Sequence, residues 1–511
     1  MNTPFSNPPV PVSVPGSGCS RGVRERLTFN HGPGTVPSRR PIEAALANQA
    51  EPTLATAAYS EPRDWDYLSM LAFTAVLMLR PQDQIPGLRS LHLAEICAVT
   101  GIAAMILHRL ARLRPVFRLT PETSGLVLFG IAILATAPFS IWPGGALEVF
   151  TDNYLKIALV FVLMMNTLTT PRRLVQTTWL ILLCCGYISA LALLNYARGT
   201  NLVEHGRLAG PVSGIFGNPN DLALNMVTFL PAAIVVAMTP RYGVWRRFAA
   251  VGVAAAMLAT VVLTQSRGGT IGLAAALLAL VLLGRNVRPG LGAIAVATVL
   301  VGMPFAPASF WDRMSSILDE RQDRLQFTGS REARWIVMQE GIDAFVDRPF
   351  TGVGAGQFKN YNPPERRERW RETHNALIQV AAETGIFGLL AFSFLIVRAA
   401  IAAASTRRML RRPRGPSAPD PLHHVLSDGD RQVLSSHTVA MTAALVGWFV
   451  CSLFASVAYN WTFYYLLALI VAGRELIFDR LVASRALRTD AGKPLSVSRS
   501  GFSGRLAPGH A

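Results

Sequence analysis

Residues 247–284 read RFAAVGVAAAMLATVVLTQSRGGTIGLAAALLALVLLG. Two apolar runs, 247–264 and 269–284, flank the short polar turn Gln265–Gly269. Each run has close to the roughly 17–25 residues needed to cross a bilayer. A turn this short keeps the two runs side by side. The stretch therefore predicts a helical hairpin that crosses a membrane twice.

The same pattern extends outward in both directions. The chain is 51% hydrophobic and 15% charged, whereas soluble domains carry about 25% charged residues. We expect an all-α polytopic membrane protein with about twelve transmembrane helices. The expected helix cores are 66–80, 91–107, 124–142, 154–168, 174–196, 221–239, 247–264, 269–284, 290–305, 375–397, 436–456 and 459–478.

The polar segments divide the chain. Residues 1–65 are rich in Pro, Ser, Gly and Arg, which predicts a disordered basic tail. Nine spans are expected in 66–305 and three in 375–480. Between them lies a long polar loop, 306–374, with short helices. Residues 481–511 form a second tail.

The arginines predict the orientation. They are dense in alternate short loops, at 109–118, 172–173, 241–247, 285–288 and 398–414, and sparse in the loops between. The positive-inside rule places the dense loops and both termini in the cytoplasm. The loop 306–374 then lies outside. The net charge of +17 fits this pattern, and we exclude nucleic acid as a partner.

Three basic residues at the mouths of spans fall on the external face: Arg207, Arg267 and His374. Such groups are costly in a membrane without a partner or a function, so we take all three as candidate catalytic residues. Simpler interpretations remain: Arg267 snorkelling to lipid headgroups, and His374 merely hydrogen-bonded at a helix start.

Further polar residues are candidates for substrate binding. Asn218, Asn220 and Asp221 precede a span, where Asn220 or Asp221 can cap the helix and favour an anion; a plain turn and cap is the alternative. Asn375 follows His374, and Glu383 lies about nine residues into an apolar run, where an acid is functional or paired with arginine.

The loop 306–374 contains an amphipathic stretch, 330–346, in which Arg331 and Arg334 share one face. They are candidate substrate-binding residues, although such a pair is more often a solvated face. The glycines at 352, 354 and 356 lack the βαβ context of a nucleotide loop, so we interpret them as a tight turn. The sequence has no HExxH, Walker A or Cys/His cluster, and we expect neither metal nor cofactor.

Several sequence motifs, taken in their order along the chain, resemble those of the O-antigen ligase and polymerase family of bacterial envelope proteins. They are Gly-Arg-Leu-Ala-Gly…Gly-Asn-Pro-Asn-Asp (206–221), Ser-Arg-Gly-Gly (266–269), Ser-Arg…Arg-Trp…Asp-Arg-Pro-Phe-Thr-Gly-Val-Gly (330–354) and His-Asn…Glu-Thr-Gly-Ile-Phe-Gly (374–388). The resemblance covers about residues 65–480.

The resemblance implies a GT-C-like glycosyltransferase in the bacterial inner membrane. Its donor would be a glycan on undecaprenyl diphosphate, used at the periplasmic face without metal. The acceptor would be another glycan or lipid A–core, and polysaccharide export or chain-length proteins are candidate partners. The family's key basic residues map to Arg207, Arg267 and His374. The long N-terminal tail departs from the family pattern.

The chemistry of these residues agrees with this expectation. Guanidinium groups can stabilise the negative charge that grows on a departing diphosphate. A histidine that titrates near neutrality can take a proton from the acceptor hydroxyl. We therefore expect a single displacement with inversion. The absence of any feature tied to lipid A–core favours a polymerase over a ligase.

Two rival functions remain at this stage. A transporter fits the number of spans and an acid inside the membrane, but one built from two six-span repeats would carry its long connection at the middle, on the cytoplasmic side. A non-catalytic scaffold of an export complex would use the basic tail to bind acidic lipid or a partner. The scaffold predicts tolerance of substitutions at all three candidate catalytic residues.

Overall fold

The computed structural model describes residues 64–491, except for a set of internal positions. These are 86, 89–90, 112, 114, 204–205, 213–215, 285–289, 291–296, 298–305, 317–329, 362–370, 412–421 and 423–424. Nearly all of the expected N-terminal tail and of the ninth expected span, 290–305, lies outside the described residues.

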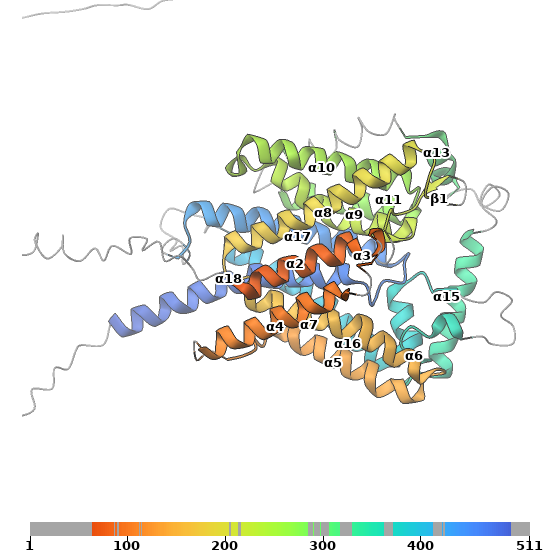
Figure 1. The fold of residues 1–511 in the computed structure, drawn as a ribbon, viewed down its shortest axis with the longest axis horizontal. Helices are drawn as coiled ribbons and strands as arrows, with labels where there is room; N and C mark the ends of the chain where they lie inside the picture. Colours follow the sequence, from red (N-terminus) through yellow and green to blue (C-terminus); the bar gives the residue numbers. More distant parts are fainter. Residues whose placement is uncertain are drawn as a thin grey trace, which may run out of the picture. The chain divides into compact units, whose positions relative to one another are not determined.

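The described chain is helical apart from one small hairpin (Figure 1). The long helices are α2 (Trp65–Leu79), α4 (Leu93–Ala111), α5 (Pro121–Thr136), α7 (Leu155–Thr167), α8 (Pro171–Ala197), α9 (Pro219–Met238), α10 (Gly243–Leu263), α11 (Arg267–Gly284), α15 (Ser330–Asp347), α16 (Ala376–Leu410), α17 (Asp428–Ser452) and α18 (Trp461–Ala491). The short elements are α3 (Pro81–Gln84), η2 (Ala137–Phe139), α6 (Pro143–Glu148), η3 (Val149–Tyr154), β1 (Leu202–Val203), β2 (Arg207–Leu208), η5 (Pro240–Tyr242), α13 (Ala308–Ser315) and η7 (Phe358–Asn360).

Eight helices in the described part of the chain are long and apolar enough to cross a membrane. They are α4, α5 with η2, α8, α9, α10 with η5, α11, α16 and α17. The protein is therefore an all-α, multi-pass membrane protein. Three more expected spans correspond to helices: α2 and α7 have only 15 and 13 residues, and α18 continues to Ala491, past the expected boundary at 480.

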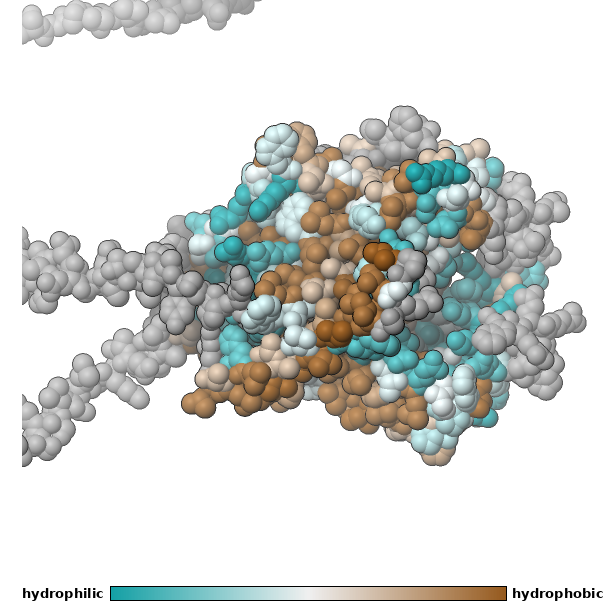
Figure 2. All heavy atoms as spheres, in the orientation of Figure 1, coloured by the Kyte–Doolittle hydropathy of each residue, from teal (hydrophilic) through white to brown (hydrophobic). Residues whose placement is uncertain are grey.

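Close contacts between helices rest on small residues. Helix α11 packs on α17 and α9, and α5 packs on α16. A Cβ atom at Gly272 of α11 would lie 2.2 Å from the Cys451 sulfur, and one at Gly447 of α17 would lie 2.8 Å from the Ala276 Cβ. Small residues allow this approach between membrane helices. Figure 2 shows apolar side chains over α2, α4 and α5, on the surface that lipid would cover.

A buried charged cluster joins three helices. Glu122 of α5 is completely buried. Its carboxylate accepts hydrogen bonds of 2.8 and 2.7 Å from Arg474 of α18 and one of 3.0 Å from Arg398 of α16. A carboxylate in this setting needs such partners because an isolated buried charge is strongly unfavourable.

Helix α16 is interrupted at Gly385, whose φ is 64° and ψ is −163°. The backbone N–H groups of Val353 and Gly354 donate to the carbonyls of Ala382 and Glu383 at 2.9 and 2.8 Å, and the N–H of Ile386 donates to the carbonyl of Pro349 at 2.7 Å. The glycine-rich segment 352–356, interpreted from sequence as a tight turn, thus fills the break and satisfies backbone groups that have no water to bind inside a membrane.

A π-helical segment, η3, connects α6 to α7. Such bulges insert one residue into a helix and are often found at functional sites. Here the segment places Val149 and Asn153 toward the cavity described below.

Candidate functional site

Arg207 joins two helix starts. It lies in β2, only 5% exposed. Its Nε donates to the carbonyl of Thr264 at 3.1 Å and an Nη donates to Asn220 Oδ1 at 2.9 Å. The same Asn220 oxygen accepts from Ser266 Oγ at 2.9 Å. The start of α9 and the turn before α11 are therefore held together around one buried guanidinium.

The start of α9 differs from the expectation in its cap. Asn218 caps the helix instead: its Oδ1 accepts from the backbone N–H groups of Asn220 and Asp221, each at 2.9 Å. The reason is Pro219, which favours the first helical position and so moves the cap to the preceding residue. This leaves Asn220 available for Arg207.

Arg267 opens α11 and is held by α13. Its Nε donates to the carbonyl of Arg313 at 3.2 Å, and an Nη donates to Ser316 Oγ. Gln265, two residues before Arg267, has a φ of 50°. A left-handed residue that is not glycine costs about 1–3 kcal/mol and is often found at functional sites.

His374 also has a left-handed backbone, with a φ of 51°. Its N–H donates to Ser456 Oγ at 2.9 Å, and Thr373 Oγ1 lies 3.1 Å from the same oxygen. The next residue, Asn375, caps α16 by accepting from the N–H groups of Leu377 and Ile378. The strained histidine is thus held between a capped helix and a serine from another segment.

The loop between α17 and α18, residues 453–460, connects the two halves of the site. Asn375 Nδ2 donates to the carbonyl of Leu453 at 3.3 Å, and Ser456 binds the His374 backbone. On the other side, a Cβ atom at Gly268 would lie 2.6 Å from the Phe454 Cβ. The residues that follow Arg267 and those around His374 therefore pack on one loop.

The surroundings of His374 are cationic. Burial first, and then the positive charges of Arg334 and Arg371, lower the pKa of His374 from 6.5 to about 4. The imidazole is therefore neutral at neutral pH. Arg334 comes from α15, so this candidate reaches the site, whereas the side chain of Arg331 lies outside the described residues.

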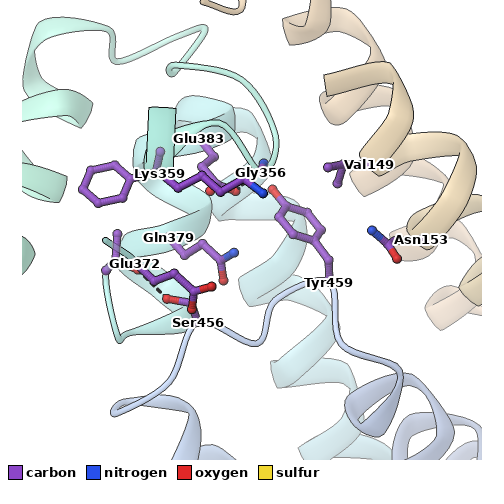
Figure 3. A pocket seen from close by; sticks show the side chains of 11 residues that line it. Val149, Asn153, Gly356, Lys359, Glu372, Gln379, Glu383, Ser456 and Tyr459 are labelled. Atoms are coloured by element: carbon purple, nitrogen blue, oxygen red, sulfur yellow. Dashed lines mark hydrogen bonds between the residues drawn. The ribbon is translucent and has the colours of Figure 1, made fainter. Parts of the chain in front are cut away.

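A cavity of about 230 Å³ lies beside His374 (Figure 3). His374 itself is not among its lining residues, but both Thr373 and Ser456 are. The lining residues are Val149, Asn153, Gly356, Phe358, Lys359, Glu372, Thr373, Gln379, Glu383, Ser456 and Tyr459. Carboxylate, amide, hydroxyl, amine and aromatic groups together suit a ligand rich in hydroxyl groups.

Glu383 lies deep in this cavity, 3% exposed, and its Oε2 accepts from the N–H of Gly356 at 2.8 Å. Figure 3 shows the phenol of Tyr459 directed toward these two residues. The hydroxyl of Tyr459 interacts electrostatically with the Glu383 carboxyl.

Glu372 connects the cavity to the start of α9. Withdrawal from water raises the pKa of its carboxyl, which Lys359 partly offsets. The carboxyl also interacts electrostatically with Asp221 of α9. The candidates Arg207, Asn220 and Asp221 thus belong to the same region as His374.

A titration checks this picture of His374. Replacing Arg334 with glutamine removes a positive charge, so the pKa of His374 should rise from about 4 toward 6.5. NMR of histidine-labelled protein measures it, using the resonance that disappears in a His374→Asn variant. Because the folded pKa is depressed, this histidine should also lower stability as the pH falls from 6.5 through 4. An unchanged titration midpoint of His374 in the Arg334→Gln variant would contradict this electrostatic effect of Arg334.

The sequence did not single out several of these residues. Lys359, Gln379, Ser456 and Tyr459 are ordinary in type and come from segments far apart in the chain. Glu372 stands next to Thr373-His374, and this proximity was the one signal that could have found it.

The comparison with known families bears on this region. Residues 252–393 match the family described as O-antigen ligase. The matched segment runs from α10 into α16 and contains Arg267, Arg334, His374 and Glu383, whereas Arg207 lies before it. No curated protein matches the chain significantly. The chain is therefore a multi-pass membrane protein that contains an O-antigen ligase domain at residues 252–393.

Proposed function

We propose that the protein transfers a glycan from undecaprenyl diphosphate to an acceptor hydroxyl, at the periplasmic face of the bacterial inner membrane. The observation that carries the proposal is that the segments after Arg267 and around His374 pack on one loop, 453–460. Arg207 holds the turn before Arg267, and the charge of Arg334 acts on His374. Both termini are cytoplasmic in this proposal, and the fold is GT-C-like with about twelve spans.

The arginines act on the leaving group. As the bond between the sugar C1 and the phosphate oxygen breaks, the electron pair moves to the diphosphate. Charged donors that are already in place stabilise this charge better than water does. Arg207 is fixed by Thr264 and Asn220, which makes it a pre-organised donor. No step of this proposal requires a metal.

His374 acts on the acceptor. The acceptor oxygen forms the new bond to C1, and the imidazole takes its proton. A pKa of about 4 makes a weak base in the free enzyme. A bound diphosphate would offset the charges of Arg334 and Arg371, and so raise the pKa of His374 toward the working range.

The cavity beside His374 would hold a sugar ring next to the reacting atoms. Glu383 and Tyr459 line this cavity, and Asn218, Asn220, Asp221 and Asn375 remain proposed substrate-binding residues outside its lining. Arg331 remains a proposed further donor to the phosphates. The acceptor is a glycan or lipid A–core, and export or chain-length proteins are proposed partners.

The glycan profile of a deletion strain tests the function. Accumulation of single lipid-linked repeat units without polymer would identify a polymerase, which we favour. Full-length polymer that stays on undecaprenyl diphosphate would identify a ligase. An unchanged glycan profile in the deletion strain would contradict the proposal. Uptake of a solute that depends on the protein would support the rival transporter.

Arg267→Ala should lower transfer by about 10²–10³-fold, the loss typical of removing one oxyanion donor. The matched control is Arg198→Ala, because Arg198 is exposed at the end of α8 on the same proposed face. The readout is the amount of transferred glycan relative to membrane-inserted protein. Arg267→Lys should recover only part of the activity, since lysine lacks the planar fork. Full activity in Arg267→Ala would remove this role.

A further inference from the structure

Helix α15 has three different sides. Val337, Gly341 and Ala344 are buried, and a Cβ atom at Gly341 would lie 2.7 Å from Ile378 of α16. This side is fixed against the first turns of the membrane-spanning helix. Figure 1 places α15 beside the ends of the long helices, not among them.

A second side carries an exposed apolar stripe. Trp335, Ile342 and Val346 are 60%, 48% and 66% exposed. At 3.6 residues per turn they fall within about 20° of one line along the helix. The neighbouring strip of the helix surface carries the exposed polar residues Glu332, Gln339 and Asp343, together with Ile336, which is 47% exposed.

The stripe continues onto a surface that lipid covers. Beyond Val346, the ring of Phe350 lies 6.2 Å from that of Phe387 in α16, and both are more than half exposed. Phe387 belongs to the exposed side of a membrane span, together with Leu390 and Phe394. The apolar surface of α15 is therefore an extension of the lipid-facing surface of α16.

We propose that α15 is an interfacial helix, whose apolar stripe is buried at the headgroup and acyl-chain boundary of the bilayer. Helices that lie in the interface place one apolar side toward the acyl chains and a polar side toward water, and the division between the stripe and Gln339 or Asp343 has this form. The bilayer contact holds Arg334 at the height of the phosphate groups, on the side of α15 that acts on His374.

Labelling of the full-length protein in phospholipid nanodiscs tests the proposal. Single cysteines replace Ile342 and Val346 on the stripe, and Gln339 and Asp343 on the polar side of the same helix as matched controls. The background carries Cys19→Ser and Cys97→Ser, while Cys184, Cys185 and Cys451 are buried. Each variant receives an environment-sensitive fluorophore in discs of phosphatidylethanolamine and phosphatidylglycerol, with and without doxyl-labelled phosphatidylcholine.

At 342 and 346 we expect blue-shifted emission, quenching by the doxyl lipid and protection from aqueous iodide. At 339 and 343 we expect emission at longer wavelength, no quenching by the doxyl lipid and quenching by aqueous iodide. Equal quenching by iodide at all four positions would overturn the proposal, because α15 would then lie in water. Protection from iodide without doxyl quenching at 342 and 346 would also overturn it, because a protein surface would then cover the stripe. This measurement is independent of enzymatic activity.

Discussion

Replacing His374 is expected to lower glycan transfer by roughly 10²–10⁴-fold, the contribution typical of a positioned general base. His374→Asn is the better variant, because asparagine tolerates the left-handed backbone that this position requires. It should therefore keep the bond to Ser456 and the cap of α16, and lose only the titrating ring. His374→Ala should lose activity as well, with some additional strain.

The control is His92→Ala. His92 also has a left-handed backbone, with a φ of 44°, is exposed, and lies before α4 on the same proposed face. Transfer is measured with purified protein in proteoliposomes, on lipid-linked glycan that accumulates in the deletion strain. Wild-type transfer by a His374→Asn protein that inserts normally would exclude His374 as the base. A base elsewhere in the cavity, such as Glu372, would then have to be tested.

Gly385→Ala is expected to have the largest effect on folding. The φ of 64° and ψ of −163° at this position belong to a region that is essentially restricted to glycine and costs on the order of 1–3 kcal/mol for other residues. The new Cβ would also lie 2.6 Å from the carbonyl carbon and oxygen of Phe350. The glycine-rich segment could then no longer fill the break in α16, and its hydrogen bonds to Ala382 and Glu383 would be lost.

Thermal unfolding in detergent, followed by size-exclusion chromatography, measures this effect. Gly252→Ala is the control, because a Cβ at Gly252 in α10 would meet nothing within 4 Å; it should be neutral or slightly stabilising. Equal unfolding temperatures for the two variants would mean that the break is not required.

The sequence predicted what depends on local pattern. Apolar runs joined by polar connections predicted the long apolar helices of the described chain. The motifs, in their order along the chain, indicated the family whose model matches residues 252–393. The break in α16 was not predicted, since one glycine within a long and mostly apolar segment does not by itself interrupt a predicted span. The groups that satisfy its free carbonyls come from Val353 and Gly354, about thirty residues earlier, and no periodicity reports such a contact.

The site was predictable in part for the same reason. Basic residues at the mouths of spans are conspicuous because their placement is costly, which made Arg207, Arg267 and His374 visible as candidates. Asn220 was a candidate for capping and substrate binding and not for holding Arg207. Ser266 and Ser456 were not candidates, since they are common residues whose role depends on distant partners. The cap at Asn218 could have been predicted correctly by giving Pro219 its usual place at the first helical position.

The buried carboxylate of Glu122 has a consequence for how the chain is made. Its two guanidinium partners are synthesised long after it: Arg398 in α16 and Arg474 in the last helix. During translation α5 is complete while both partners are still missing, and an unpaired acid is strongly unfavourable in lipid. The cluster around Glu122 is therefore complete only once α18 has been made, and we expect a chain truncated before Arg474 to be recognised by membrane quality control.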